Sequence, residues 1–180
     1  LNLNGIGRLS SITDESGSTT YGYDDRGNIL SETRVISGQS YTTSYTYNLS
    51  DQTMSLTYPS GRVLTYTRDS AGRIDGATTQ ASGGPVETVV SNLTYMPFGR
   101  AADWTYGNGV THSNTYDLDY RLDRLVSTGV LDLDLGYSSV NNITSIVNGL
   151  TPASNQTFDY DNLQRLTDAT GTYGDIDYTY

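Results

Sequence analysis

The chain has 180 residues and a formal net charge of −10 at pH 7, with 20 acidic residues, ten arginines, and neither lysine nor cysteine. This balance disfavours nucleic acid and anionic membranes as partners, and the lack of Cys excludes disulfides and Cys-bound metals. Only 35% of the residues are hydrophobic, yet 16 are tyrosines, and Tyr and Thr favour strands. The composition therefore indicates a β-sheet with a thin or hydrated core, and no apolar run reaches the roughly 20 residues of a spanning helix.

A short motif recurs along the whole chain, 20 to 27 residues apart. It is most complete at Tyr23–Ile29, which reads Tyr-Asp-Asp-Arg-Gly-Asn-Ile, and it returns at Tyr160–Leu166. We call its first residue the anchor. This spacing predicts a single run of about eight repeats over residues 1–180, with the anchors Leu3, Tyr23, Tyr47, Arg68, Tyr95, Tyr116, Tyr137 and Tyr160, and with Tyr180 as the next anchor.

A type I turn is predicted immediately after each anchor. Asp24 would cap the turn through its side chain, and Gly27 accepts a positive φ angle. Strands rich in Ser, Thr and Tyr would flank the turn, for example over residues 28–35, so that each repeat supplies two strands. The residues predicted to set the geometry of these turns are Asp24, Gly27, Asp69, Gly72, Gly99, Asp117 and Asp161.

A second class of turn is predicted between the anchors, at residues 58–63 and 106–110, with a possible third case at 173–176. Residues 81–85 form a loop insertion in the longest interval, and the alternation of residues 131–135 predicts a strand. No helix is predicted. About 16 strands would form a flat sheet about 77 Å wide, and open sheets of more than about ten strands usually curl or split. We therefore expect the sheet to coil, with open edges that pair with further repeats.

The motif resembles the YD repeat of the Rhs family, Tyr-Asp-x-x-Gly-Arg/Asn-Leu/Ile, at residues 23–29 and 160–166. Residues 95–100 and 58–63 are similar to variants of that repeat. The resemblance covers essentially the whole chain. It implies an all-β fold in which tandem antiparallel hairpins form a continuous curved or spiralling sheet, part of a hollow shell.

The same resemblance implies a function in encapsulation. Rhs-type shells typically enclose a C-terminal toxin, as in bacterial polymorphic toxins and insecticidal toxin complexes, and similar repeats form the barrel of teneurins. Such shells usually end in a self-cleavage site that contains Asp-Pro. None of the four prolines here follows an Asp, so neither the protease nor the toxin is assigned to these residues, and we expect the chain to be a fragment of a longer array.

Other candidate sites each have a simpler structural explanation. Trp104 and Tyr106 are a weak candidate for binding a glycan, although periodic tyrosines are better explained as cross-strand ladders that stack between neighbouring strands. The single His112 is expected to be a surface or packed residue. Pairs of aspartates two residues apart could bind calcium or act in acid–base catalysis, but we expect them to cap turns or to solubilise one face; these pairs are 117/119, 132/134, 159/161 and 175/177.

The leading hypothesis is a non-enzymatic shell segment of a secreted or cell-surface bacterial protein that encloses a toxin or other cargo and pairs with flanking repeats. The alternative is an extracellular adhesin or filament-forming appendage built from the same repeats, with carbohydrate as its candidate ligand. A glycan hydrolase that uses an aspartate pair is a third hypothesis. No cofactor and no metal are predicted.

Overall fold

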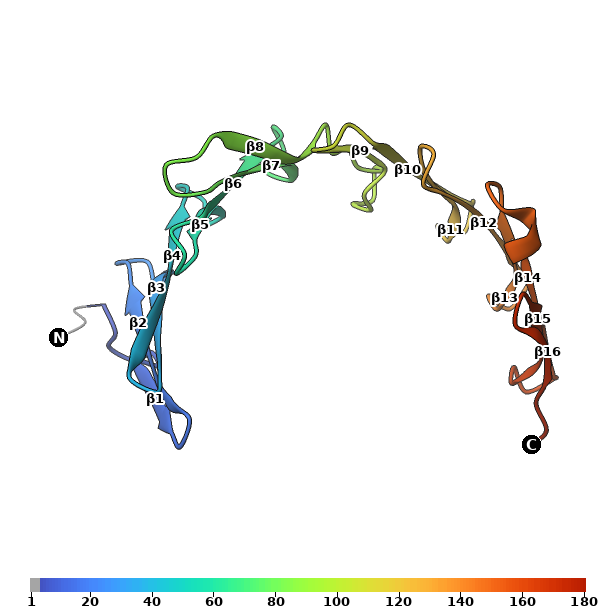
Figure 1. Ribbon diagram of the computed structural model, residues 1–180, viewed down its shortest axis with the longest axis horizontal. Helices are drawn as coiled ribbons and strands as arrows, with labels where there is room; N and C mark the ends of the chain where they lie inside the picture. The colour runs from blue at the N-terminus through green and yellow to red at the C-terminus, as the bar shows by residue number, and fades with distance from the viewer. Residues whose placement is uncertain (1–3) are drawn as a thin grey trace. The chain divides into compact units, whose positions relative to one another are not determined.

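The computed structural model describes residues 4–180, which divide into two units, one ending at Ser91 and one spanning Asn92–Tyr180. The predicted anchor Leu3 lies outside the described residues. Residues 4–180 contain 16 strands, and in each unit the strands are hydrogen-bonded in chain order, antiparallel to their neighbours. The prediction of an all-β chain of consecutive antiparallel hairpins is confirmed, and Figure 1 shows the strands of each unit as a single layer.

The first unit contains eight strands joined by short turns. Their bounds are β1 (Ser11–Asp14), β2 (Gly17–Tyr23), β3 (Ile29–Ile36), β4 (Gln39–Tyr47), β5 (Thr53–Thr57), β6 (Val63–Arg68), β7 (Ile74–Gln80) and β8 (Val86–Ser91).

The second unit also contains eight strands. Their bounds are β9 (Asp103–Tyr106), β10 (Thr111–Tyr116), β11 (Leu122–Ser127), β12 (Leu131–Tyr137), β13 (Ile143–Asn148), β14 (Gln156–Tyr160), β15 (Leu166–Gly171) and β16 (Gly174–Asp177). A one-turn 3₁₀ helix, η1 (Pro152–Ser154), interrupts the β13–β14 connection, so the prediction of no helix was wrong at this point. Pro152 at its start explains the turn, because proline fixes a helical φ angle and needs no amide partner there.

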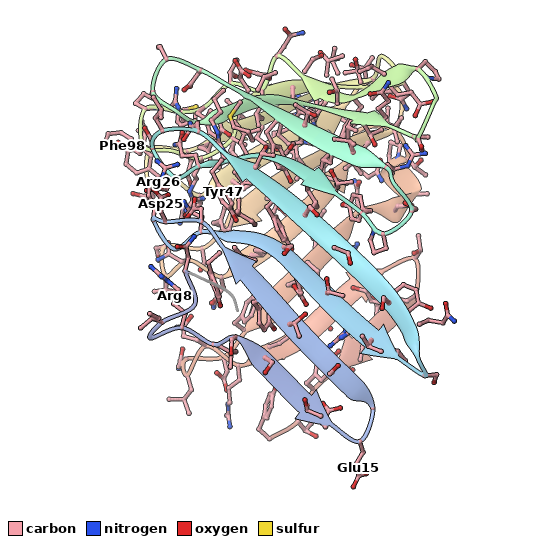
Figure 2. All side chains as sticks on the ribbon, turned by 90° about the vertical axis from the view of Figure 1, so that its left-hand side faces the viewer. Arg8, Glu15, Asp25, Arg26, Tyr47 and Phe98 are labelled. Carbon is pink, nitrogen blue, oxygen red and sulfur yellow. The ribbon has the colours of Figure 1, made fainter. Side chains whose placement is uncertain are left out.

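The turns alternate between the two ends of the strands. The turns after the anchors gather at one end, which we call the anchor rim, and the intervening turns form the opposite rim. In the first unit, Figure 2 shows Arg8, Asp25 and Arg26 on the anchor rim, and Glu15, from the β1–β2 turn, at the other end of the strands. The residues of the predicted anchor turns thus lie along one rim of each unit.

The two faces of each sheet differ in chemistry. On one face of the second unit, cross-strand neighbours pair Leu125 with Leu133, Leu135 with Ile146, and Phe158 with Ala169. The other face is hydroxylated and acidic; there Thr157 lies opposite Thr170, and Asp159, Asp168 and Asp177 lie side by side. The period of two along a strand produces this separation.

Little of this sheet is buried. Among residues 4–180 the buried hydrophobic residues are three alanines, at 77, 102 and 169, and the buried polar residues are Thr19, His112 and Ser127. Within each unit no second layer of strands or helices packs on either face of the sheet. Most tyrosines and leucines are therefore only half-buried, against their cross-strand neighbours. The stability of each unit therefore depends strongly on contacts within the layer.

Candidate functional site

The anchor turns after the first share one backbone geometry. After Tyr160, the amide of Asp161 donates to the carbonyl of Arg165 at 2.9 Å, and the amide of Gln164 donates back to the carbonyl of Asp161 at 3.0 Å. The side chain of Asp161 accepts from the amides of Leu163 and Arg165 at 2.8 and 3.0 Å. The same side-chain cap is made by the residue after the anchor at Asp24, Asn48, Asp69, Asp117 and Ser138.

The fourth residue after the anchor has a positive φ angle in every described anchor turn after the first. Glycine occupies this place at Gly27, Gly72 and Gly99, with φ between 80° and 97°. Tyr120 and Gln164 adopt the same region at 60° and 63°, although L-residues there cost roughly 1–2 kcal/mol. The capped turn holds them in this conformation, which the sequence motif alone would assign to glycine.

Six anchor tyrosines reach back to the preceding repeat. The hydroxyl of Tyr137 donates to the carbonyl of Leu122 at 2.8 Å, and that of Tyr160 donates to the carbonyl of Ile143 at 2.9 Å. In both cases the acceptor is the sixth residue after the previous anchor. The same bond joins Tyr23 to Leu9, Tyr47 to Ile29, Tyr116 to Ala101 and Tyr180 to Leu166.

Arg68 makes this bond where the anchor is not tyrosine. Its Nη2 donates to the carbonyl of Thr53 at 2.8 Å, again the sixth residue after the previous anchor, and its Nη1 donates to the carbonyl of Gly72 at 3.0 Å. The Nε of Arg68 is buried and has no hydrogen-bond partner among the described residues. Arginine therefore reproduces the donor of the tyrosine but leaves one polar atom unsatisfied.

Arginine side chains cover several anchor rings. The guanidinium carbon of Arg121 lies 4.7 Å from the ring centroid of Tyr137, and that of Arg165 lies 4.5 Å from the ring of Tyr180. Arg8 and Arg100 lie over the rings of Tyr23 and Tyr116 in the same way. Each of these arginines is the fifth residue after the preceding anchor.

The sequence predicts that the anchor tyrosines stack between neighbouring strands in cross-strand ladders, but direct stacking of one anchor ring on the next does not fit the spacing of the anchors. Successive anchors lie two strands apart, which is about 10 Å, whereas stacked rings lie about 4.5–7 Å apart. The arginine between them fills this gap. Its guanidinium gains from the negative face of the ring.

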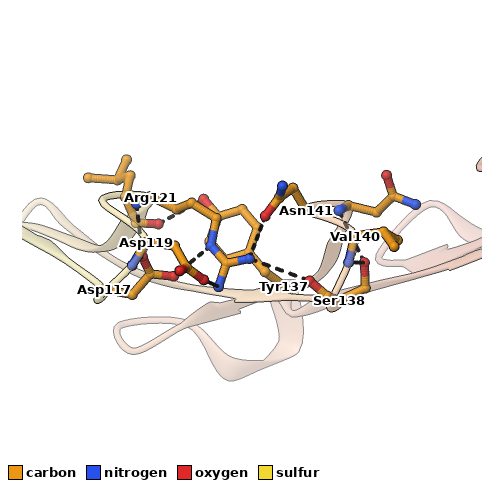
Figure 3. Close-up of polar contacts among 9 residues, drawn as sticks. Asp117, Asp119, Arg121, Tyr137, Ser138, Val140 and Asn141 are labelled. Atoms are coloured by element: carbon orange, nitrogen blue, oxygen red, sulfur yellow. Dashed lines mark hydrogen bonds and ion pairs between the residues drawn. The ribbon is translucent and has the colours of Figure 1, made fainter.

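Arg121 also connects two turns, as Figure 3 shows. It forms ion pairs with Asp117 at 2.6 Å and with Asp119 at 3.3 Å in its own turn, and its Nη1 donates to Oδ1 of Asn141 in the next turn at 2.8 Å. Asn141 is the positive-φ residue of that turn. The fifth residue of one turn thus contacts both the anchor ring and the tip of the following turn.

An amide side chain replaces arginine in three repeats and keeps the connection between turns. Nδ2 of Asn28 donates to Oδ1 of Asp51 at 2.7 Å, and Nε2 of Gln52 donates to the carbonyl of Gly72 at 3.0 Å. Asn142 donates to Oε1 of Gln164 at 2.6 Å. In each case the acceptor belongs to the fourth residue of the next turn.

Hydrogen bonds within the turns lower the pKa of several carboxyl groups. The hydrogen bond from the Asn28 side chain lowers the pKa of Asp24, and the amide and guanidinium of Arg165 lower the pKa of Asp161. For Asp69 and Asp117, desolvation opposes the shift, but hydrogen bonds from Arg73 and Arg121 outweigh it and the pKa falls. These aspartates are thus held as charged acceptors that close the turn.

The other aspartates of the predicted pairs have different surroundings. Asp132 pairs with Arg124 at 2.8 Å, and the guanidinium lowers the pKa of this carboxyl. Asp159 lies opposite Asp168 on the acidic face. Within residues 4–180 no three His, Asp or Glu side chains are placed to hold a metal ion.

Trp104 and Tyr106 lie in one aromatic cluster with His112. The His112 ring stacks on Trp104 with centroids 3.9 Å apart, and Tyr106 meets Trp104 edge-on at 6.0 Å. His112 is buried and hydrogen-bonded, through Nδ1 to Ser127 at 2.7 Å and through Nε2 to Asn114 at 2.9 Å. The histidine is therefore a packed residue that covers one face of Trp104, and carbohydrate binding here stays a prediction.

The remaining predicted turns are on the opposite rim. Gly61 and Gly109 donate to the carbonyls of Tyr58 and Tyr106 at 2.9 Å, which gives the same five-residue loop as the anchor turns. The third predicted case, at residues 173–176, differs: Gly171 pairs directly with Gly174, which makes a two-residue hairpin. No helix in the described part of the chain is long and apolar enough to cross a membrane.

The chain shares its fold with large toxin complexes. Residues 4–38 match the family model described as RHS Repeat, whereas no curated protein sequence matches. Crystal structures of TcdB2-TccC3 and TcdB2-TccC3-Cdc42 align with TM-scores of 0.85 and 0.84, at 23% and 22% identity. The Photorhabdus luminescens Tc holotoxin pore aligns at 0.83 and 23% identity.

These alignments cover 91% of this chain but only 9–10% of the other chains, so the chain spans about a tenth of their length. At this level of identity they show a common fold. Residues 4–38 thus match an RHS repeat, and the described chain shares its fold with these toxin-complex chains.

Proposed function

We propose that the chain is a wall segment of a secreted bacterial Rhs/YD-repeat shell that encloses a toxin or another protein cargo. In this proposal its eight repeats belong to a longer array that coils around the cargo, and the chain itself performs no catalysis. The observation that carries the proposal is a hydrogen bond to the preceding repeat from seven anchors, namely Tyr23, Tyr47, Arg68, Tyr116, Tyr137, Tyr160 and Tyr180.

This bond suits a wall because it makes each repeat dependent on its neighbour. A repeat that buries little surface of its own gains stability by stacking on the next. The end strands β1 and β16 each pair on one side only among the described residues, and an unpaired strand is a template for further strands. Further repeats on both sides would satisfy these strands and extend the same layer.

The alternative is an appendage in which such sheets form a uniform filament. Electron microscopy of the longer protein separates the two: hollow particles support enclosure, and filaments without a lumen contradict it.

Protease protection tests the enclosure directly. In the longer protein, the cargo should resist protease as long as the wall is intact. Replacement of Tyr116, Tyr137 and Tyr160 by Ala should make the cargo sensitive, whereas the same change at the half-exposed Tyr41 and Tyr58, which are not anchors, should not. Retained resistance in the triple anchor variant would refute the role of the anchors in the wall.

A further inference from the structure

The anchor rim of the second unit carries a row of exposed apolar side chains. Each of its four turns has one at the second or third place after the anchor: Phe98, Leu118, Val140 and Leu163. Their exposed fractions lie between 54% and 99%. Single exposed apolar residues are ordinary, but one in each of four successive turns, about 10 Å apart, forms a regularly spaced row.

The opposite rim of the same unit carries a matching row. Its four turns place Tyr106, Val130, Leu150 and Tyr173 at the surface, with exposed fractions between 40% and 67%. Both rows therefore have one large apolar side chain for every two strands. In the first row, Phe98 also contacts Tyr120 of the next turn, with ring centroids 5.0 Å apart, which joins the first two of the four turns.

Both rims are free of net charge, unlike the strands between them. The four anchor turns contain three arginines and three aspartates, and the four opposite turns contain no charged residue. The acidic residues of the strands, such as Asp159 and Asp168, lie on the hydroxylated face instead. Two copies that approached each other through this acidic face would be repelled by their like charges, whereas a copy that approached a rim would not be repelled.

We propose that the anchor rim of the second unit docks on the opposite rim of a second copy of this chain. The period is the main argument: a partner must present apolar groups about 10 Å apart to contact the whole row, and the opposite rim does so with the same spacing. A contact between two unlike surfaces of the same chain is heterologous. A pair of copies joined in this way keeps one free rim at each end, so further copies can add to it. This contact is separate from strand pairing at β1 and β16 and does not depend on a cargo.

Sedimentation velocity of the chain over a range of concentrations tests the contact. The native chain should self-associate. Leu118→Asp with Leu163→Asp should weaken association at least about tenfold, and Val130→Asp with Leu150→Asp should do the same from the other rim. The control is Val147→Asp with Val89→Asp, which adds the same charge at exposed strand positions and should leave association unchanged. Circular dichroism should show native secondary structure in all variants.

Mixing the two rim variants is the decisive measurement. Each retains the rim that the other has lost, so the mixture should form a one-to-one pair that does not grow further. A native chain that stays monomeric would overturn the proposal, and so would association that survives both rim variants, which would place the contact on strand edges or on the apolar face. An opposite-rim variant that associates alone would show that two anchor rims meet each other.

Discussion

Removing the hydroxyl of Tyr137 isolates the bond between two repeats. Tyr137→Phe leaves the ring under Arg121 but removes the donor to the Leu122 carbonyl, which should cost about 1 kcal/mol of unfolding free energy. Tyr137→Ala also removes the cation–π contact, worth about 0.5–1 kcal/mol. Burial of about half of a tyrosine surface adds about 2 kcal/mol, so the alanine variant should lose about 4 kcal/mol in total.

Urea unfolding followed by circular dichroism measures both variants. With an m value of about 2 kcal/mol/M, the phenylalanine variant should unfold about 0.5 M earlier. Tyr41→Phe, at a half-exposed tyrosine that is not an anchor, serves as the control and should not change the midpoint. The reasoning is refuted if both phenylalanine variants unfold with the native midpoint, since the hydroxyl bond would then contribute nothing.

Three further changes test the turns. The free energy of unfolding should fall as the pH drops below about 4, because four carboxyl groups have a lower pKa in the folded chain than in the unfolded chain and bind protons less readily when folded. These groups are Asp24, Asp69, Asp117 and Asp161. Urea midpoints at several pH values measure this loss. Arg68→Tyr should raise stability on the order of 1 kcal/mol, because it removes the unsatisfied buried Nε and keeps a donor for Thr53; an unchanged or lower urea midpoint would contradict this. Gly99→Ala should cost about 1 kcal/mol from backbone strain alone, since φ is 91° and no atom lies near the added Cβ, and a melting temperature equal to that of the native chain would argue against it.

The sequence contains enough local information to predict the strands and the turns. Asp24 and Gly27 belong to one turn, so their chemistry determines a geometry that depends on few distant residues. The same reasoning failed at the 3₁₀ helix of residues 152–154, where proline follows a threonine in a loop without a periodic pattern. Tyr120 and Gln164 show a further limit, because the side-chain cap of the turn imposes a positive φ on residues that do not favour it.

The contacts between repeats were not predictable from a single motif. Tyr137 and Leu122 are 15 residues apart, and nothing in either residue indicates the other. The sequence does contain one signal of these contacts: arginine recurs at the fifth place after the anchor, at positions 8, 73, 100, 121 and 165. That regularity pointed to a partner at a fixed distance, and the structure shows this partner to be the next anchor ring at Tyr23, Tyr116, Tyr137 and Tyr180.

The choice of acceptor explains how such different repeats keep one geometry. The seven anchors with this bond donate to a backbone carbonyl, which is present whatever residue occupies the position; the acceptors include Ile29, Thr53, Ala101 and Leu122. Only the donor has to be retained, and Arg68 shows that even the donor can change from a hydroxyl to a guanidinium. Because this bond does not depend on the side chain of the acceptor, we expect the sheet to tolerate variation at the acceptor positions, as the proposed wall of unequal repeats would require.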